Sequence, residues 1–170
     1  MCANERKYHM KIASMDASHR NAVMAHIEED WGLPVVTRGK IIDIGNIPGF
    51  VATDGDELLG GVLYQIVQHE CEMVVLFSLR ENRGSGAALV NAVVEAARAA
   101  TCRRVWLITT NDNTHAMRFY QKHGFALKAA HINAFRVTQA IKGETGDENG
   151  LVLGTDGIPI LHEMEFEMLL

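Results

Sequence analysis

The sequence reads Arg83-Gly84-Ser85-Gly86-Ala87-Ala88 at the point where a predicted strand gives way to a predicted helix. Small residues at such a turn let backbone N–H groups crowd around an anion, and the start of the helix adds the positive end of its dipole. The turn therefore suits a pyrophosphate. Its spacing matches neither the dinucleotide fingerprint G-x-G-x-x-G nor a P-loop, and taken alone such a turn is more often only a turn.

Hydrophobic periodicity around this turn predicts an α/β fold, with a central mixed, mainly antiparallel sheet and helices on both faces. Asp54-Gly55 between two apolar runs indicates a hairpin, so the first strands are antiparallel. The helix after the glycine-rich turn makes the crossover to a parallel strand. The expected strands cover residues 7–14, 50–53, 58–67, 72–79, 104–109, 125–132 and 160–168, and the expected helices cover residues 17–31, 87–100 and 113–123.

Two stretches and the final strand carry further expectations. Residues 35–49 have an irregular pattern typical of a loop or a short helix, and residues 143–157 hold five glycines among acidic residues, which indicates a long mobile loop. The last strand alternates between apolar residues on one face and Glu163, Glu165 and Glu167 on the other. We therefore expect it to be half-buried.

Composition limits the class of protein. The 170 residues fit one domain spanning 1–170, and 48% of them are hydrophobic, as in folded soluble proteins. No apolar run approaches the roughly 20 residues that span a bilayer, and the start is polar, so we expect a cytoplasmic protein without membrane contact. The net charge of -5 argues against nucleic acid and favours a cationic acceptor.

Neither a disulfide framework nor a metal site is predicted. Cys2, Cys71 and Cys102 show no C-x-x-C spacing, and the eight histidines form no H-E-x-x-H or comparable cluster. His115 and His123 are interpreted as helix-surface residues, and His162 as a satisfied core histidine. We assign no metal.

A second motif gives the glycine-rich turn its meaning. It reads Asn113-Thr114-His115-Ala116-Met117-Arg118-Phe119-Tyr120-Gln121-Lys122-His123-Gly124-Phe125 and matches N-x-x-A-x-x-F-Y-x-x-x-G-F in full. The turn matches R-x-x-G-x-A through Arg83, Gly86 and Ala88. In order, spacing and intervening elements, residues 70–132 resemble the GNAT superfamily of acyl-CoA-dependent N-acyltransferases.

The resemblance implies acetyl-CoA as co-substrate and assigns residues to it. The backbone of Phe77, Ser78 and Leu79 would pair with the pantetheine arm, and Asn113 would contact the cofactor from the end of the next strand. The pyrophosphate would be cradled by Arg83, Gly84, Ser85, Gly86, Ala87 and Ala88. Family members commonly have five steps from the last pantetheine-contacting residue to the loop arginine, whereas Leu79 to Arg83 spans four.

Two residues are candidates for proton transfer. Tyr120 would lie near the sulfur and act as general acid for the departing thiolate; the alternative is a tyrosine packed on the sheet beside Phe119. Glu72 is the candidate general base for a protonated amine, because some GNAT enzymes place a catalytic glutamate near the start of this strand. The alternative for Glu72 is an exposed strand-end side chain.

The function expected from the resemblance is direct transfer of an acetyl group to a primary amine. The acceptor is a small molecule or a peptide, with walls expected from residues 31–49 and 143–157, and a homodimer is compatible with the sequence. The rival class is an acyl-CoA-binding sensor or interaction module without turnover, since fold alone does not set function. Tyr120 favours the enzyme.

Overall fold

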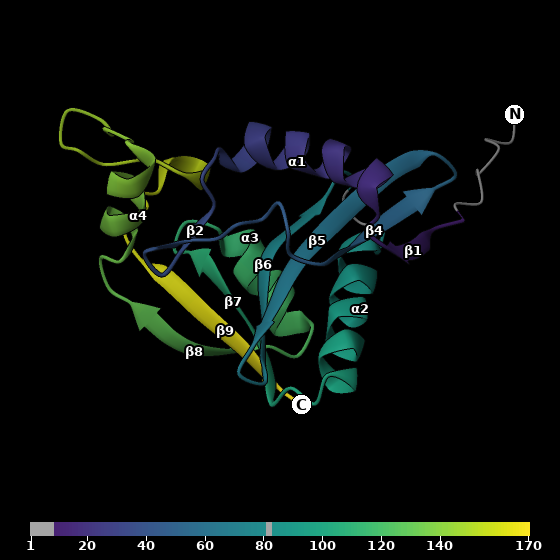
Figure 1. Ribbon diagram of the computed structural model, residues 1–170. Helices are drawn as coiled ribbons and strands as arrows, with labels where there is room; N and C mark the ends of the chain where they lie inside the picture. The colour runs from purple at the N-terminus through teal and green to yellow at the C-terminus, as the bar shows by residue number, and fades with distance from the viewer. Residues whose placement is uncertain (1–8, 81–82) are drawn as a thin grey trace, which may run out of the picture.

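A seven-stranded sheet forms the centre of the molecule, and segments far apart in the sequence lie side by side in it (Figure 1). The computed structural model describes residues 9–80 and 83–170. Its helices are α1 (Ala17–Trp31), α2 (Ser85–Ala99), α3 (Thr114–Lys122) and α4 (Phe135–Lys142), with a 3-10 helix η1 (Thr155–Gly157). Its strands are β1 (Lys11–Ser14), β2 (Val36–Thr37), β3 (Lys40–Ile41), β4 (Gly49–Asp54), β5 (Glu57–Val67), β6 (Glu70–Ser78), β7 (Arg104–Thr110), β8 (Ala126–His131) and β9 (Glu163–Leu169).

The order of the sheet is β1-β4-β5-β6-β7-β9-β8, and all neighbours pair antiparallel except β6 and β7. The predicted mixed sheet, the hairpin at Asp54-Gly55 and the parallel crossover through α2 are confirmed. The parallel pairing is short. It runs from Glu70 opposite Arg104 to Met73 opposite Leu107, while both strands continue beyond this point.

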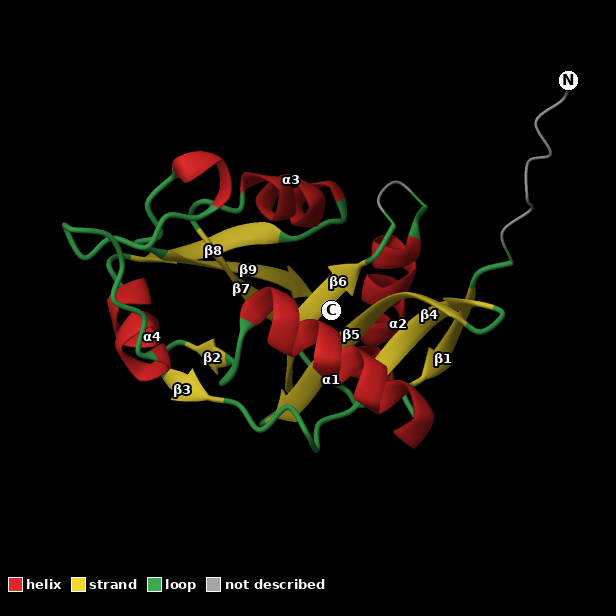
Figure 2. Cartoon of the chain, turned by 90° about the horizontal axis from the view of Figure 1, so that it is seen from above, coloured by secondary structure: helices red, strands yellow, loops and turns green. Residues whose placement is uncertain are grey.

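Helices cover both faces of the sheet, as expected (Figure 2). On one face, Val23 and Ile27 of α1 pack in a buried cluster with Val51 of β4. On the other face, Leu89 of α2 and Tyr120 of α3 share a second buried cluster. Strands β4, β5 and β6 contribute side chains to both clusters, whereas Val105 and Leu107 of β7 belong to the cluster beneath α2.

Local sequence explains where α1 begins and ends. The Asp16 carboxylate accepts hydrogen bonds from the N–H groups of Ser18 and His19, at 2.9 Å and 3.0 Å, and thus caps the first turn. Gly32 ends the helix at φ 66°, a conformation that glycine adopts without the strain of a Cβ. Both signals were predicted.

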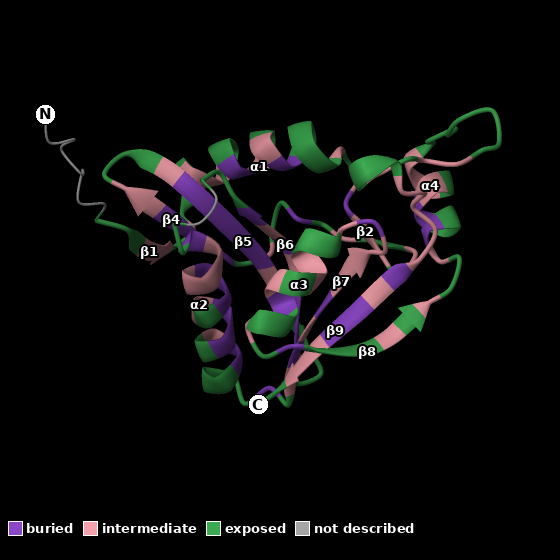
Figure 3. Cartoon of the chain, turned by 180° about the vertical axis from the view of Figure 1, so that it is seen from behind, coloured by how far each residue is buried: buried purple, intermediate pink, exposed green. Residues whose placement is uncertain are grey.

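Four features of the structure differ from the sequence predictions. Residues 35–49 contain the two-stranded β2–β3 hairpin rather than a plain loop or helix, and α4 was not predicted. The prediction of a half-buried last strand is wrong, because Glu163 and Glu165 are buried although they lie on its charged face. Figure 3 shows part of β9 in the colour of buried residues. The strand begins at Glu163 rather than at residue 160.

The loop at residues 143–157 is held by side chains that accept hydrogen bonds from its backbone. Asp147 accepts from the N–H groups of Asn149 and Leu151, each at 2.9 Å, and closes a turn within the loop. Asp112, which follows β7, accepts from the Thr155 N–H at 2.8 Å and so ties the loop to the sheet. The loop thus has defined anchors that its composition did not indicate.

Candidate functional site

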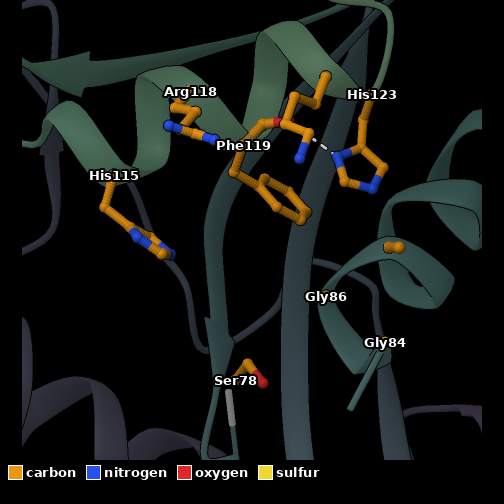
Figure 4. Close-up of a pocket in the computed structure, with 9 residues that line it drawn as sticks. Ser78, Gly84, Gly86, His115, Arg118, Phe119 and His123 are labelled. Carbon is orange, nitrogen blue, oxygen red and sulfur yellow. Dashed lines mark hydrogen bonds between the residues drawn. The ribbon is translucent and has the colours of Figure 1, made fainter. Parts of the chain in front are cut away.

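The main pocket lies between the start of α2 and one face of α3, and has a volume of about 450 Å³ (Figure 4). It opens beside the end of β6, where that strand no longer pairs with β7. Its lining residues are Ser78, Gly84, Gly86, Ala87, His115, Arg118, Phe119, Lys122 and His123.

The start of α2 has the properties of an anion site. Gly84 is its N-cap residue at φ 79°, a left-handed conformation that glycine adopts without strain. A Cβ added there would meet nothing within 4 Å, so the space beside the turn is open. The first N–H groups of a helix have no partner within the helix, and the helix dipole makes this end positive. A hydrogen bond of 2.7 Å between the hydroxyls of Ser78 and Ser85 joins the end of β6 to this turn.

The opposite wall of the pocket is a basic face of α3. His115, Arg118, Lys122 and His123 all line the pocket from this helix. His123 Nδ1–H donates to the Phe119 carbonyl at 2.8 Å, which fixes the orientation of its ring. Since the chain has a net charge of -5, such a gathering of basic groups points to a ligand with several negative charges.

Sequence reasoning missed this basic face. It took His115 and His123 for surface residues, although the helical spacing of His115, Arg118 and Lys122 places them on one side of the predicted helix. That spacing was the available signal. The side of α3 that faces a ligand is identified only in the structure, where Gly84, Gly86 and Ala87 line the same pocket as these residues.

Phe77, Ser78 and Leu79, the predicted pantetheine contacts at the end of β6, differ in which of their groups a ligand can reach. The Phe77 side chain packs against His26 with 4.2 Å between ring centroids, so only its backbone is available to a ligand. The Leu79 N–H already donates to the Leu59 carbonyl at 2.9 Å. Because alternate N–H groups of a strand point to opposite sides, the Ser78 N–H points away from β5, toward the side where β7 has parted.

The predicted turn residues and Asn113 are placed as follows. Gly84, Gly86 and Ala87 line the main pocket, and Ser85 is buried beneath it. Arg83 is exposed, and Ala88 donates its N–H to the Gly84 carbonyl as part of α2. The Asn113 side chain accepts from the Ala116 N–H at 3.0 Å and caps α3, so its oxygen is already occupied.

Tyr120 is buried in the core rather than on the pocket wall. Its ring packs against Phe125 and Phe166, with centroid distances of 5.7 Å and 6.3 Å. Burial raises the pKa of its phenol well above the usual range, so the group holds its proton. The packing alternative therefore describes the surroundings of Tyr120.

Glu72 is buried, with only 5% of its surface exposed, so the alternative of an exposed strand-end glutamate is wrong. Its Oε2 accepts from Gln65 Nε2 at 2.7 Å, and its Oε1 has no hydrogen-bond partner. Burial raises the pKa of Glu72, and the hydrogen bond from Gln65 and the charge of Arg38 offset part of this effect. A carboxylate whose pKa is raised is a stronger base and is better suited to accept a proton.

A second pocket, of about 180 Å³, lies beside the end of β7 and was not located by the sequence. It is lined by Trp31, Val35, Val36, Thr37, Ile108, Thr109, Thr110, Asn113, Phe135, Thr138, Lys142 and Glu163. Residues 31–37 belong to the stretch expected to form acceptor walls. The 143–157 loop contributes none of these residues and lines a separate, shallow hollow.

Within the described ranges 9–80 and 83–170, no group of three or more histidine, cysteine or acidic side chains is arranged to hold a metal ion. In the same part of the chain no helix is both long and apolar enough to cross a bilayer. Cys71 and Cys102 are buried free thiols, and burial raises the pKa of Cys71 to about 12.

Comparison with known proteins gives a consistent family. The model of the acetyltransferase (GNAT) family matches residues 18–125. The YdhI protein of Bacillus subtilis (strain 168) is 36% identical over 142 residues, which cover 78% of this chain and 89% of YdhI.

Solved structures agree with the fold. A Bacillus subtilis acetyltransferase in complex with CoA superposes with a TM-score of 0.67 at 18% identity, covering 96% of this chain and 99% of that chain. The ribosomal-protein-S18-alanine N-acetyltransferase of Escherichia coli has a TM-score of 0.65 at 16% identity, covering 94% and 93% of the two chains.

Proposed function

Because this chain belongs to the acetyltransferase (GNAT) family, we propose that it transfers an acetyl group from acetyl-CoA to a primary amine by direct attack. The observation that carries the proposal is the main pocket. It places the positive start of α2 opposite the basic face of α3 and opens at the end of β6. A phosphorylated, polyanionic cofactor is the ligand that such a pocket favours.

The proposed binding mode follows the geometry of the pocket. The backbone of residues 83–88 holds the pyrophosphate, while Lys122 and Arg118 add charge from α3. The pantetheine arm runs along β6, where the Ser78 N–H is directed away from β5. With its oxygen committed to the cap of α3, Asn113 contacts the cofactor through its amide nitrogen.

The proposed chemistry needs an acid and a base. The amine nitrogen attacks the acetyl carbonyl carbon, the bond between that carbon and sulfur breaks, and the proton lost by the amine passes to Glu72. Tyr120 gives its phenolic proton to the departing thiolate. The raised pKa of Glu72 supports its role, since it makes the group a stronger base than an exposed carboxylate. Tyr120 holds its proton at neutral pH, so the proton is present when the thiolate departs.

Direct transfer is favoured over an acyl-enzyme on cysteine. A nucleophilic cysteine needs an accessible thiolate. Cys71 and Cys102 are buried, and burial raises the pKa of both thiols. Neither lines the main pocket.

The test combines two measurements on the full chain. Calorimetry with CoA reports binding, and release of free thiol from acetyl-CoA in the presence of mixed primary amines reports turnover. Amine-dependent thiol release, with an acetylated amine detected by mass spectrometry, is the expected result. Tight CoA binding with no turnover on any amine contradicts the transferase and favours the sensor reading, and failure to bind CoA contradicts both.

A further inference from the structure

Glu163 is a buried acidic residue that the proposed reaction does not use. It begins β9 and lies opposite Thr110 of β7, and only 3% of its surface is exposed. Thr138 of α4 donates its hydroxyl hydrogen to Glu163 Oε1 at 2.9 Å, whereas Glu163 Oε2 has no hydrogen-bond partner. This side chain lines the second pocket.

Within the described part of the chain, no ion pair involves Glu163. Two cationic side chains near it pair with Glu165 instead. Arg38 and His131 also flank Glu163, but both pair with Glu165, at 3.4 Å and 2.9 Å. Lys142 lines the second pocket, and its Nζ donates to the Trp31 carbonyl at 2.6 Å. A buried carboxyl oxygen without a donor is costly, by about 1–3 kcal/mol or more for a charged group.

The other walls of the second pocket narrow the chemistry of a ligand that supplies this donor. Val35, Trp31 and Phe135 provide apolar and aromatic surface, whereas the Thr37 hydroxyl lies against Glu72 and lowers the pKa of that carboxyl. A buried carboxylate within apolar walls fits an ammonium group on a short hydrocarbon stem. Aromatic faces add to the attraction for a cation.

Position along β7 separates this ammonium from the reacting amine. Pairing of β6 and β7 ends at Leu107, and Glu163 faces Thr110, three residues farther along β7. At about 3.3 Å per residue this is about 10 Å of strand. The amine that attacks the thioester lies where the strands part, so a cation held by Glu163 is a second group of the same acceptor.

We propose that the second pocket binds the acceptor and that Glu163 selects small amines carrying a second cationic group a few carbon atoms from the reacting one. The proposal rests on the proposed function, because it describes the acceptor of that transfer. It assigns Glu163 a role in specificity, with the proton transfers left to Glu72 and Tyr120.

The test compares two acceptors of nearly equal length, 1,4-diaminobutane and 4-aminobutan-1-ol, which differ in the charge at the far end. The wild-type protein should show a kcat/KM for the diamine about tenfold to a hundredfold above that for the amino alcohol, the range expected for a hydrogen bond to a charged group. In Glu163→Gln the preference should disappear through a higher KM for the diamine, with the amino alcohol unaffected. Glu163→Asp, which keeps the carboxylate, should retain part of the preference for the diamine.

Controls separate this proposal from the function on which it rests. Glu95→Gln removes an equal charge from an exposed position on α2 and should leave the preference intact. Calorimetric titration of each variant with CoA, followed by 1,4-diaminobutane, reports both pockets without turnover. Normal CoA binding with equal affinity for the two acceptors, or an unchanged preference in Glu163→Gln, overturns the role of Glu163. Loss of CoA binding in the wild type overturns the acetyltransferase itself.

Discussion

Replacing Glu72 by glutamine is expected to stabilise the protein at neutral pH while lowering its activity. The pKa of Glu72 is raised above its ordinary value of 4.5, mainly because burial penalises the charged form. Between 4.5 and the raised pKa, the folded protein holds a proton that the unfolded chain has released. Wild-type stability therefore falls as the pH rises through this interval, and remains lower above it.

The gain in Tm depends on how far burial raises the pKa of Glu72. Each unit of pKa difference corresponds to about 1.4 kcal/mol, and about 1 kcal/mol moves Tm by about 2–4 °C in a domain of this size. Glutamine can still accept from Gln65, and its amide can donate toward the Thr37 hydroxyl, which acts on the Glu72 pKa and has no partner at Oγ1. We expect Glu72→Gln to have the higher Tm at about pH 8, by about 3–6 °C for each unit of pKa difference. The gain should vanish at about pH 4, where the folded and unfolded wild-type chains both hold the proton.

Thermal unfolding of the wild type and Glu72→Gln across this pH range measures the gain, with Glu95→Gln as the exposed control. In the same variant, loss of a general base should reduce the transfer rate by about 10²- to 10⁴-fold and remove the decline of the wild-type rate toward low pH. A Tm difference that does not change with pH would refute the raised pKa. A variant with full activity would refute the base.

Three further predictions concern the main pocket, the acid and the loop anchor. Tyr120→Phe should bind CoA normally and lose about 10²- to 10⁴-fold in turnover, least with acyl donors of low thiol pKa; equal turnover on every donor would leave the phenol as packing alone. Lys122→Glu should weaken CoA binding several-fold in calorimetry, and less so at high salt, whereas Lys11→Glu on β1 should not; an unchanged affinity removes Lys122 from the site. Gly154→Ala should lower stability by about 1–3 kcal/mol in denaturant unfolding, because the new methyl group would run into the Asp112 carboxylate; a neutral result would show that Asp112 can move.

The parts of the fold that sequence predicted are those decided by neighbouring residues. Asp54-Gly55 forms a tight turn wherever two apolar strands flank it, and Asp16 caps a helix through bonds to residues two and three positions away. The turn at Gly84 likewise depends on local conformation. Hence local sequence predicts β1, the strands from β4 to β9, and α1, α2 and α3, whereas it does not predict β2 and β3.

The parts that sequence missed depend on distant contacts. Glu165 is buried on a face that alternation marked as exposed, because Arg104, Arg38 and His131 surround it from other elements. The start of α4 has no side-chain cap at Ala134, so no local signal announced the helix. The alternation also places Glu163 on the outer face of the last strand. Its contact with Thr138 of α4 comes from a distant segment, so the sequence did not indicate the second pocket.

The parting of β6 and β7 gives a physical reason for placing the proposed acid and the proposed base on opposite faces of the sheet. Cys71 and Met73 belong to the cluster beneath α2, so Glu72 between them points to the opposite face of the sheet, while Tyr120 lies on the α2 side. A continuous sheet would keep the two groups apart from any shared substrate. Because pairing ends just after Met73, a thioester in the gap can be approached by an amine from one face and lose its thiol toward the other.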